Sequence, residues 1–230
     1  MDNVAFESGS GLSHPYFPVA LNLPHYAANS LNMYQLLGAF GLGVVAVIGM
    51  GSILLARRPH LSWLARITFL WFLISGCIHF FFEGYFVYNH ATLAGDQTLF
   101  GQLWKEYSLS DSRYLSSDSF VLLMELVTAV FDGPLCFLTA YAILNDSPLR
   151  YITQLMVSLA QIYGDVLYYT TTLFEGSPHC TPHPYYFWFY FVTLNAIWII
   201  VPTLLGCQAC QQLYRAVART QALDGKKKVQ

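Results

Sequence analysis

The sequence predicts an all-α, polytopic membrane protein built as a single bundle of five transmembrane helices. The chain is 55% hydrophobic and only 10% charged, whereas an average soluble domain is about 25% charged. Five stretches also provide the ~20 mostly apolar residues that a helix needs to cross the hydrocarbon core. The net charge is −2 and no basic block precedes the tail, so the bilayer, and not nucleic acid, is the expected partner.

The five predicted spans follow one another without a repeat, a low-complexity segment or a linker, which predicts one membrane domain over residues 1–230. The first span is the most apolar, and the second carries an ionisable pair inside the run GCIHFFFEGYF. The spans cover residues 34–56, 63–91, 118–144, 150–174 and 185–213, all approximately. Residues 1–33 are expected to form an N-terminal segment on one side, and residues 214–230 a tail on the other.

The arginines and lysines predict the orientation of the bundle. Nine of the eleven fall on one side of a five-span topology, and only Lys105 and Arg113 fall on the other. Basic residues flank the cytoplasmic ends of spans, so the C-terminus is expected in the cytoplasm and the N-terminus in the lumen. The ending KKVQ resembles a dilysine retrieval signal, which favours the endoplasmic reticulum membrane.

Four carboxyl groups fall inside the predicted spans: Glu83, Glu125, Asp132 and Asp165. A charge at the centre of a bilayer costs about 2.5 to 3.5 kcal/mol on insertion scales. Four ionised groups facing lipid would therefore cost roughly 10 to 14 kcal/mol, as much as the net stability of a whole domain. We expect these groups to face the inside of the bundle, where they are paired, hydrated or protonated.

The spacing of the polar residues supports a shared interior. Residues three, four or seven apart lie on one face of a helix, and each of the last four spans has one such stripe. The stripes are His79 and Glu83; Glu125, Thr128 and Asp132; Gln154, Ser158, Gln161 and Asp165; and Asn195 with Trp198. The first span has almost none. Spans two to five should therefore enclose a cavity, with span one packed outside.

Such stripes can also be hydrogen bonds that only hold helices together, and this explanation is favoured for the Gln154, Ser158, Gln161 stripe. It is weaker for one histidine with two glutamates. A metal site is not expected, because His79 has no second histidine at its depth. Proton chemistry is favoured instead, since a buried carboxylic acid can donate a proton that a nearby histidine relays.

Five segments, taken in order, resemble the emopamil-binding protein family of sterol Δ8–Δ7 isomerases, and the likeness covers roughly residues 14–213. They are GCIHFFFEGYF, LWKEYSLSDSRY, MELVTAVFDGPL, QIYGDVLYY and YFWFYFVTLNAIWIIVP. The resemblance implies an enzyme of the endoplasmic reticulum that moves an 8-ene double bond to the 7-ene position in sterols such as zymostenol. It implies no redox cofactor and no metal. Members of this family also bind cationic amphiphilic drugs, and a homodimer is left open.

The resemblance also implies which residues act. The catalytic set carried over from the family is His79, Glu83, Glu125, Thr128, Asn195 and Trp198. In this scheme C9 is protonated, a carbocation forms at C8, and a proton leaves C7. Glu125 and His79 deliver and remove protons in an order left open, Glu83 orients His79, Asn195 bonds the network and Trp198 faces the cation.

Further residues are predicted to contact the substrate: Phe82, Tyr85, Asp132, Gln161, Tyr163, Asp165 and Trp188. At Asp132 the chain departs from the family, because the isomerase has a tryptophan there and an isomerase-like paralogue has an acid. A catalytically silent sterol- or drug-binding relative, similar to the isomerase-like or sigma-two-receptor proteins, is therefore the alternative. A proton-coupled transporter is disfavoured, because no inverted repeat is visible.

Overall fold

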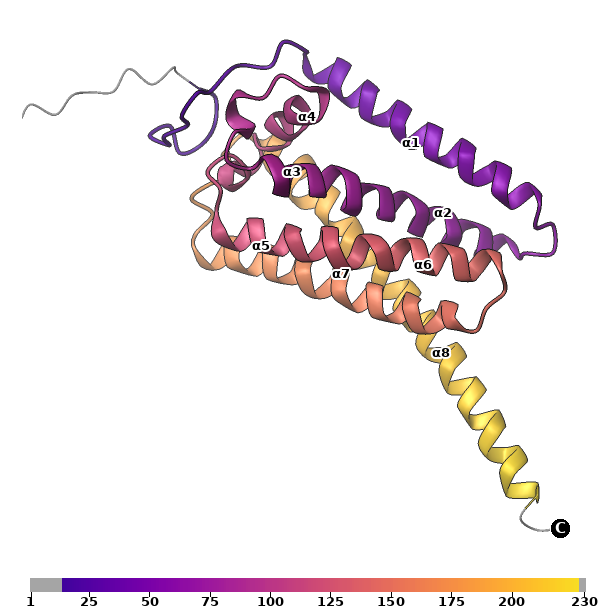
Figure 1. The fold of residues 1–230 in the computed structure, drawn as a ribbon. Coiled ribbons are helices and arrows are strands. Elements are labelled where there is room, and N and C mark those ends of the chain that lie inside the picture. The colour runs from indigo at the N-terminus through magenta and orange to yellow at the C-terminus, as the bar shows by residue number, and fades with distance from the viewer. Residues whose placement is uncertain (1–13, 228–230) are drawn as a thin grey trace, which may run out of the picture.

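The computed structural model describes residues 14–227, and the described part of the chain is a bundle of long helices (Figure 1). Three of its rods are composite, because a helical segment with π-type hydrogen bonds joins or precedes α-helical ones. The rods are α1 (Met33–Ala56); α2 (Trp63–Cys77), η1 (Ile78–Glu83) and α3 (Gly84–Asn89); α5 (Ser119–Val127), η4 (Thr128–Asp132) and α6 (Gly133–Leu144); α7 (Leu149–Phe174); and η5 (Tyr185–Leu194) with α8 (Asn195–Lys227).

Polar caps define where several of these helices begin. Asn32 and Gln35 form a reciprocal pair before α1, in which each side chain accepts a hydrogen bond from the other residue's backbone N–H at 3.0 Å. Ser62 accepts from the backbone of the first turn of α2, and Asp118 does the same before α5. Such caps satisfy N–H groups that have no partner within the helix.

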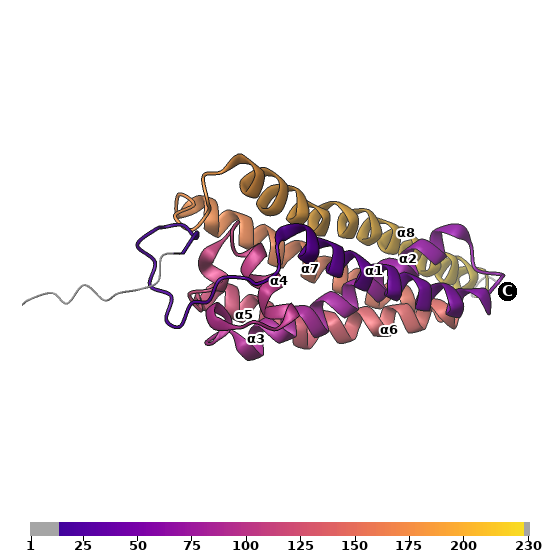
Figure 2. The same ribbon diagram turned by 90° about the horizontal axis from the view of Figure 1, so that it is seen from above.

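Four helices in the described residues are long and apolar enough to cross a membrane: Met33–Ala56, Trp63–Asn89, Ser119–Leu144 and Tyr185–Gly225. They correspond to the first, second, third and fifth predicted spans. The fourth predicted span forms α7, a helix of 26 residues that lies alongside α6 and α8 (Figure 2). It carries many of the bundle's buried polar groups, including Gln154, Gln161 and Asp165, so a total of five spans stays a prediction.

The structure extends the predicted bundle in one place and corrects it in another. Beyond the predicted span, which ends near residue 213, the last helix continues to Lys227 and projects beyond the bundle (Figure 1). The segment 214–225 is mostly exposed, and nothing in it stops a helix. The first helix is also not wholly outside, since Leu37 and Phe40 of α1 line the internal cavity. Residues 1–13, and 228–230 of the proposed retrieval signal, lie outside the described residues.

One end of the bundle is closed by a cap, which we define as residues 14–32 and 90–118. It contains η2 (Leu93–Gly95), α4 (Leu99–Tyr107) and η3 (Ser112–Tyr114). Aromatic side chains bind it to the helices: Trp104 stacks on Phe82 at 4.5 Å between ring centroids and donates to the Phe82 carbonyl. The cap also carries Lys105 and Arg113, which are 0% and 2% exposed.

Candidate active site

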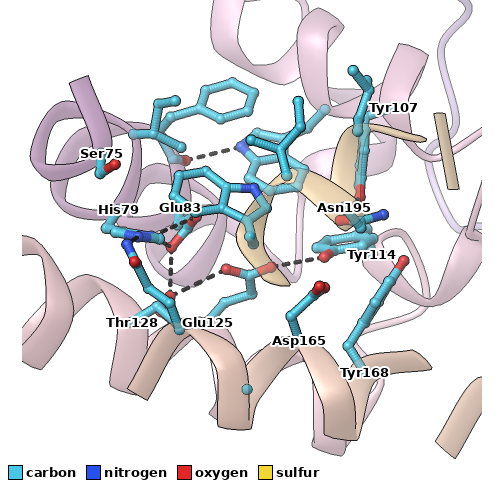
Figure 3. Close-up of a pocket in the computed structure, with 18 of the residues that line it drawn as sticks. Ser75, His79, Glu83, Tyr107, Tyr114, Glu125, Thr128, Asp165, Tyr168 and Asn195 are labelled. Carbon is cyan, nitrogen blue, oxygen red and sulfur yellow. Dashed lines mark hydrogen bonds and ion pairs between the residues drawn. The ribbon is translucent and has the colours of Figure 1, made fainter. Parts of the chain in front are cut away.

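A cavity of about 330 Å³ lies where the cap meets the bundle, within the volume range of small-molecule sites. Its lining is mostly apolar and aromatic, and a few polar groups converge on it (Figure 3). The polar lining residues include Ser75, His79, Glu83, Glu106, Tyr107, Tyr114, Glu125, Thr128, Gln161, Asp165, Tyr168 and Asn195.

The π-helical segments coincide with the site. His79 and Glu83 lie on η1, Thr128 begins η4, and Asn195 directly follows η5. A π-type turn inserts a residue into a helix and shifts the phase of its side chains, and it occurs frequently at functional sites. In this bundle three such segments, each on a different rod, bring polar side chains to one place.

His79 is held by both ring nitrogens. Nδ1 lies 2.8 and 2.7 Å from the two carboxylate oxygens of Glu83, and Nε2 lies 2.9 Å from the amide nitrogen of Gln161. With an amide N–H directed at Nε2, the ring proton is on Nδ1 and is donated to Glu83. Gln161, predicted to contact substrate, thus also sets the tautomer of the histidine.

Thr128 connects the two glutamates. Its Oγ1 lies 2.5 Å from Oε2 of Glu83 and 3.3 Å from Oε2 of Glu125 (Figure 3). Tyr114 from the cap donates to the other oxygen of Glu125 at 2.7 Å. A continuous chain of hydrogen-bonding groups therefore runs from Gln161 through His79, Glu83, Thr128 and Glu125 to Tyr114.

Two further predicted residues complete the wall. Asn195 accepts a hydrogen bond from Tyr107 at 3.0 Å and donates to the Phe191 carbonyl at 2.7 Å. The Trp198 ring lies 4.8 Å from the His79 ring, centroid to centroid, and 5.3 Å from Trp71. The indole therefore lines the cavity directly beside the histidine.

The structure brings all six predicted catalytic residues to this cavity, together with Phe82, Gln161 and Asp165 from the predicted substrate-binding set. Asp165 is 9% exposed and points toward the same space as Glu125 (Figure 3). Whether these residues act on or contact a substrate stays a prediction.

Four residues predicted to contact substrate do not line the cavity. Tyr163 and Trp188 are 70% and 62% exposed on the outside of the bundle, because positions two apart on a helix point in very different directions. Tyr85 turns instead to the cap, where its hydroxyl bonds Asp96 and Thr98. Asp132 is 1% exposed and lies buried among the helices.

Sequence reasoning missed the contributions of the cap. Tyr114 and Tyr107 hold Glu125 and Asn195, and Glu106 lines the cavity. All three come from LWKEYSLSDSRY, a segment recognised as similar to the family but assigned no role. This segment lies between two predicted spans, and its sequence has no helical periodicity that would predict its place over the site.

A family model and several related proteins agree on the family to which this chain is similar. A family model described as EXPERA, the expanded EBP superfamily, matches residues 99–209. The chain is 44% identical to the mouse (Mus musculus) 3-beta-hydroxysteroid-Δ8,Δ7-isomerase over 88% of this chain and 90% of that protein. It is 38% identical to the guinea pig (Cavia porcellus) enzyme of that name, covering 95% and 96%.

A plant protein of similar name is also related. The chain is 32% identical to the probable 3-beta-hydroxysteroid-Δ8,Δ7-isomerase of Arabidopsis thaliana, over 90% of this chain and 92% of that protein. These matches extend along the chain well beyond residues 99–209. From fold, site and relatives together, the chain belongs to the EXPERA family, the expanded EBP superfamily that includes these sterol isomerases.

Proposed function

We propose that this protein is a sterol Δ8–Δ7 isomerase, which moves the ring double bond of 8-ene sterols such as zymostenol to the 7-ene position. The observation that carries the proposal is the chain of hydrogen-bonding groups linking His79, Glu83, Thr128 and Glu125 in an apolar cavity. The names of the mammalian relatives support the same reaction. The isomerisation has no net redox change and consumes no co-reactant, so proton transfers alone accomplish it.

In the proposed mechanism Glu125 is the acid. A proton passes from its carboxyl group to C9, the electron pair of the double bond forms the new C–H bond, and C8 becomes a carbocation. Glu83, oriented by the Nδ1–H of His79 at 2.7 Å, then accepts the proton of C7. The C7–H electron pair forms the 7-ene double bond. Both ring nitrogens of His79 are occupied, so the imidazole acts through Glu83.

Thr128 closes the cycle. Its hydroxyl has one hydrogen, yet its oxygen lies within hydrogen-bonding distance of both carboxyl groups, so it can donate to one and accept from the other. A proton taken up by Glu83 is then returned to Glu125 through this hydroxyl, and the site is ready for the next sterol. This relay accounts for a threonine between two acids in an otherwise apolar region.

The origin of the new proton provides the direct test. With enzyme in excess over an 8-ene sterol in deuterated water, the 7-ene product should carry deuterium at C9, because carboxyl and hydroxyl protons exchange while the cavity is empty. Mass spectrometry and NMR of the product, with no nucleotide present, give the readout. With sterol in excess the label should fall as C7 protons return through the relay. A single-turnover product without label at C9 would rule out the mechanism.

Trp198 is proposed to stabilise the carbocation. An aromatic face beside a desolvated cation contributes about 2 kcal/mol, so Trp198→Leu should slow turnover about 30-fold. The same substitution should weaken the binding of cationic amphiphilic amines, whose ammonium takes the place of the cation. Trp188→Leu is the matched control, since that indole is 62% exposed outside the cavity. Equal losses in both variants would remove the assignment.

The location proposed for the protein is the endoplasmic reticulum membrane, with the cap in the lumen and the C-terminus in the cytoplasm. The connections α1–α2 and α6–α7, with Arg57, Arg58 and Arg150, lie at one end of the bundle, and the cap lies at the other (Figure 1). Lys105 and Arg113, the two exceptions, are buried inside the cap. The exposed positive charge near the cap end is therefore smaller than the sequence count suggests, which supports this orientation.

A further inference from the structure

Glu106 is a cavity residue that the proposed mechanism leaves unused. It lies on α4 of the cap, is 8% exposed, and lines the cavity. One carboxylate oxygen accepts a hydrogen bond from Tyr190 at 3.3 Å, and the other accepts none from the described residues and remains accessible from the cavity. A buried carboxyl group with an open oxygen in an apolar cavity is costly unless a ligand fills that position.

The neighbouring cation does not neutralise Glu106. Lys105 points the other way and donates to the Ala27 carbonyl at 2.7 Å. Among residues 14–227, Glu106 forms no ion pair within 4.0 Å. Burial also raises the pKa of Glu106 above its usual range. The structure therefore maintains an unpaired acid at the cap end of the cavity, although the cap holds two cations.

The position of this group is at the cap end of the cavity. Tyr190, its hydrogen-bond partner, precedes Asn195 by five residues on the same rod, and both residues line the cavity, so the Glu106–Tyr190 pair lies at least one helical turn nearer the cap than Asn195. In a sterol the 3β-oxygen is attached to ring A, whereas C8 and C9 belong to the adjoining ring B.

The opposite end of the cavity offers a poorer hydrogen-bond acceptor for a hydroxyl group. Ser75, one turn beyond His79 in the opposite direction, is 1% exposed, and its hydroxyl oxygen is inaccessible. Near the middle, the oxygens of Glu83 and Glu125 are already occupied by His79, Thr128 and Tyr114. Asp165 has no hydrogen-bond partner within the described residues, but it lies beside Glu125 and not at the cap end (Figure 3). The open oxygen of Glu106 is therefore the available acceptor at the cap end of the cavity for a hydroxyl group on the ring next to the reacting carbons.

We infer that Glu106 and Tyr190 form a subsite for the 3β-hydroxyl group of the sterol, so that ring A points into the cap while ring B lies against Glu83 and Glu125. This inference rests on the proposed function for the identity of the ligand. The hydroxyl donates to the open oxygen of Glu106, and Tyr190 holds the carboxyl group in place. The cap then selects for a 3-hydroxylated sterol and sets which carbons meet the acids.

The test compares an 8-ene sterol with its 3-deoxy analogue. A hydrogen bond to a buried acid is worth about 1.5 to 3 kcal/mol, so the wild-type protein should favour the hydroxylated sterol about 12- to 140-fold in kcat/KM. In Glu106→Leu this preference should fall below about threefold, whereas turnover of the deoxy analogue should change little. Glu106→Gln should keep part of the preference, because the amide oxygen still accepts a hydrogen bond.

Tyr190→Phe should reduce the preference partly, and Glu175→Gln should leave it intact, since Glu175 is an exposed acid at the end of α7. Equal kcat/KM for both sterols in the wild-type protein, or an unchanged preference in Glu106→Leu, would overturn the subsite. If neither sterol is isomerised, the proposed function has failed. The same comparison made on equilibrium sterol binding then still decides the role of Glu106.

Discussion

Replacing Glu125 by glutamine should reduce 8-ene to 7-ene conversion by at least about 100-fold, because general acid catalysis contributes roughly 10² to 10⁴. The amide has nearly the shape of the acid and can still accept the Tyr114 hydrogen bond that now spans 2.7 Å. It cannot transfer a proton to carbon. Conversion is measured by chromatography of the sterol products from purified protein in lipid nanodiscs.

The fold should survive this change, so unaltered thermal stability and binding of a cationic amine are the internal controls. Glu175→Gln, at an exposed acid outside the cavity, is the matched substitution and should keep full activity. If Glu125→Gln retains activity while both controls behave as described, Glu125 is not the acid, and the relay through Thr128 has no starting point.

Replacing Arg113 by leucine should destabilise the folded protein by about 3 to 5 kcal/mol, the range found when one partner of a buried ion pair is removed. The guanidinium Nη2 lies 2.6 Å from Asp111, with the two side chains 3% and 0% exposed. It also bonds Thr172 and lies 5.0 Å over the Tyr168 ring. Without it, the carboxylate of Asp111 remains buried with no cation beside it.

For a chain of this size the loss corresponds to a melting temperature lower by roughly 10 °C, which a thermal-unfolding scan in detergent will detect. Arg57→Leu removes the same charge from an exposed position and should change the melting temperature little. A double variant, Arg113→Leu with Asp111→Leu, should regain part of the loss, since no buried charge is then unpaired. A melting temperature for Arg113→Leu equal to that of wild type would contradict a structural role for the ion pair.

The apolar spans, their approximate ends and the polar stripes within them could be predicted from the sequence. The helices begin near residues 33, 63, 119, 149 and 185, close to the expected positions, because membrane length and helix caps are local properties of the chain. The sequence also predicts that His79, Glu83, Glu125 and Asn195 face the inside of the bundle. An ionisable or amide group at membrane depth needs a polar interior whatever the packing.

What the tertiary structure decided is which groups meet. The π-type segments shift the phase of three rods, and no count of three or four residues foresees such a shift. His79 on one such segment meets Gln161 of α7, and Thr128 on another joins two acids. Tyr163 and Trp188 face outward. The cap contributes Glu106, Tyr107 and Tyr114 from a segment with no helical stripe of its own. Local periodicity predicts which face of a helix is polar, but contacts between segments far apart in the chain depend on how the whole bundle packs.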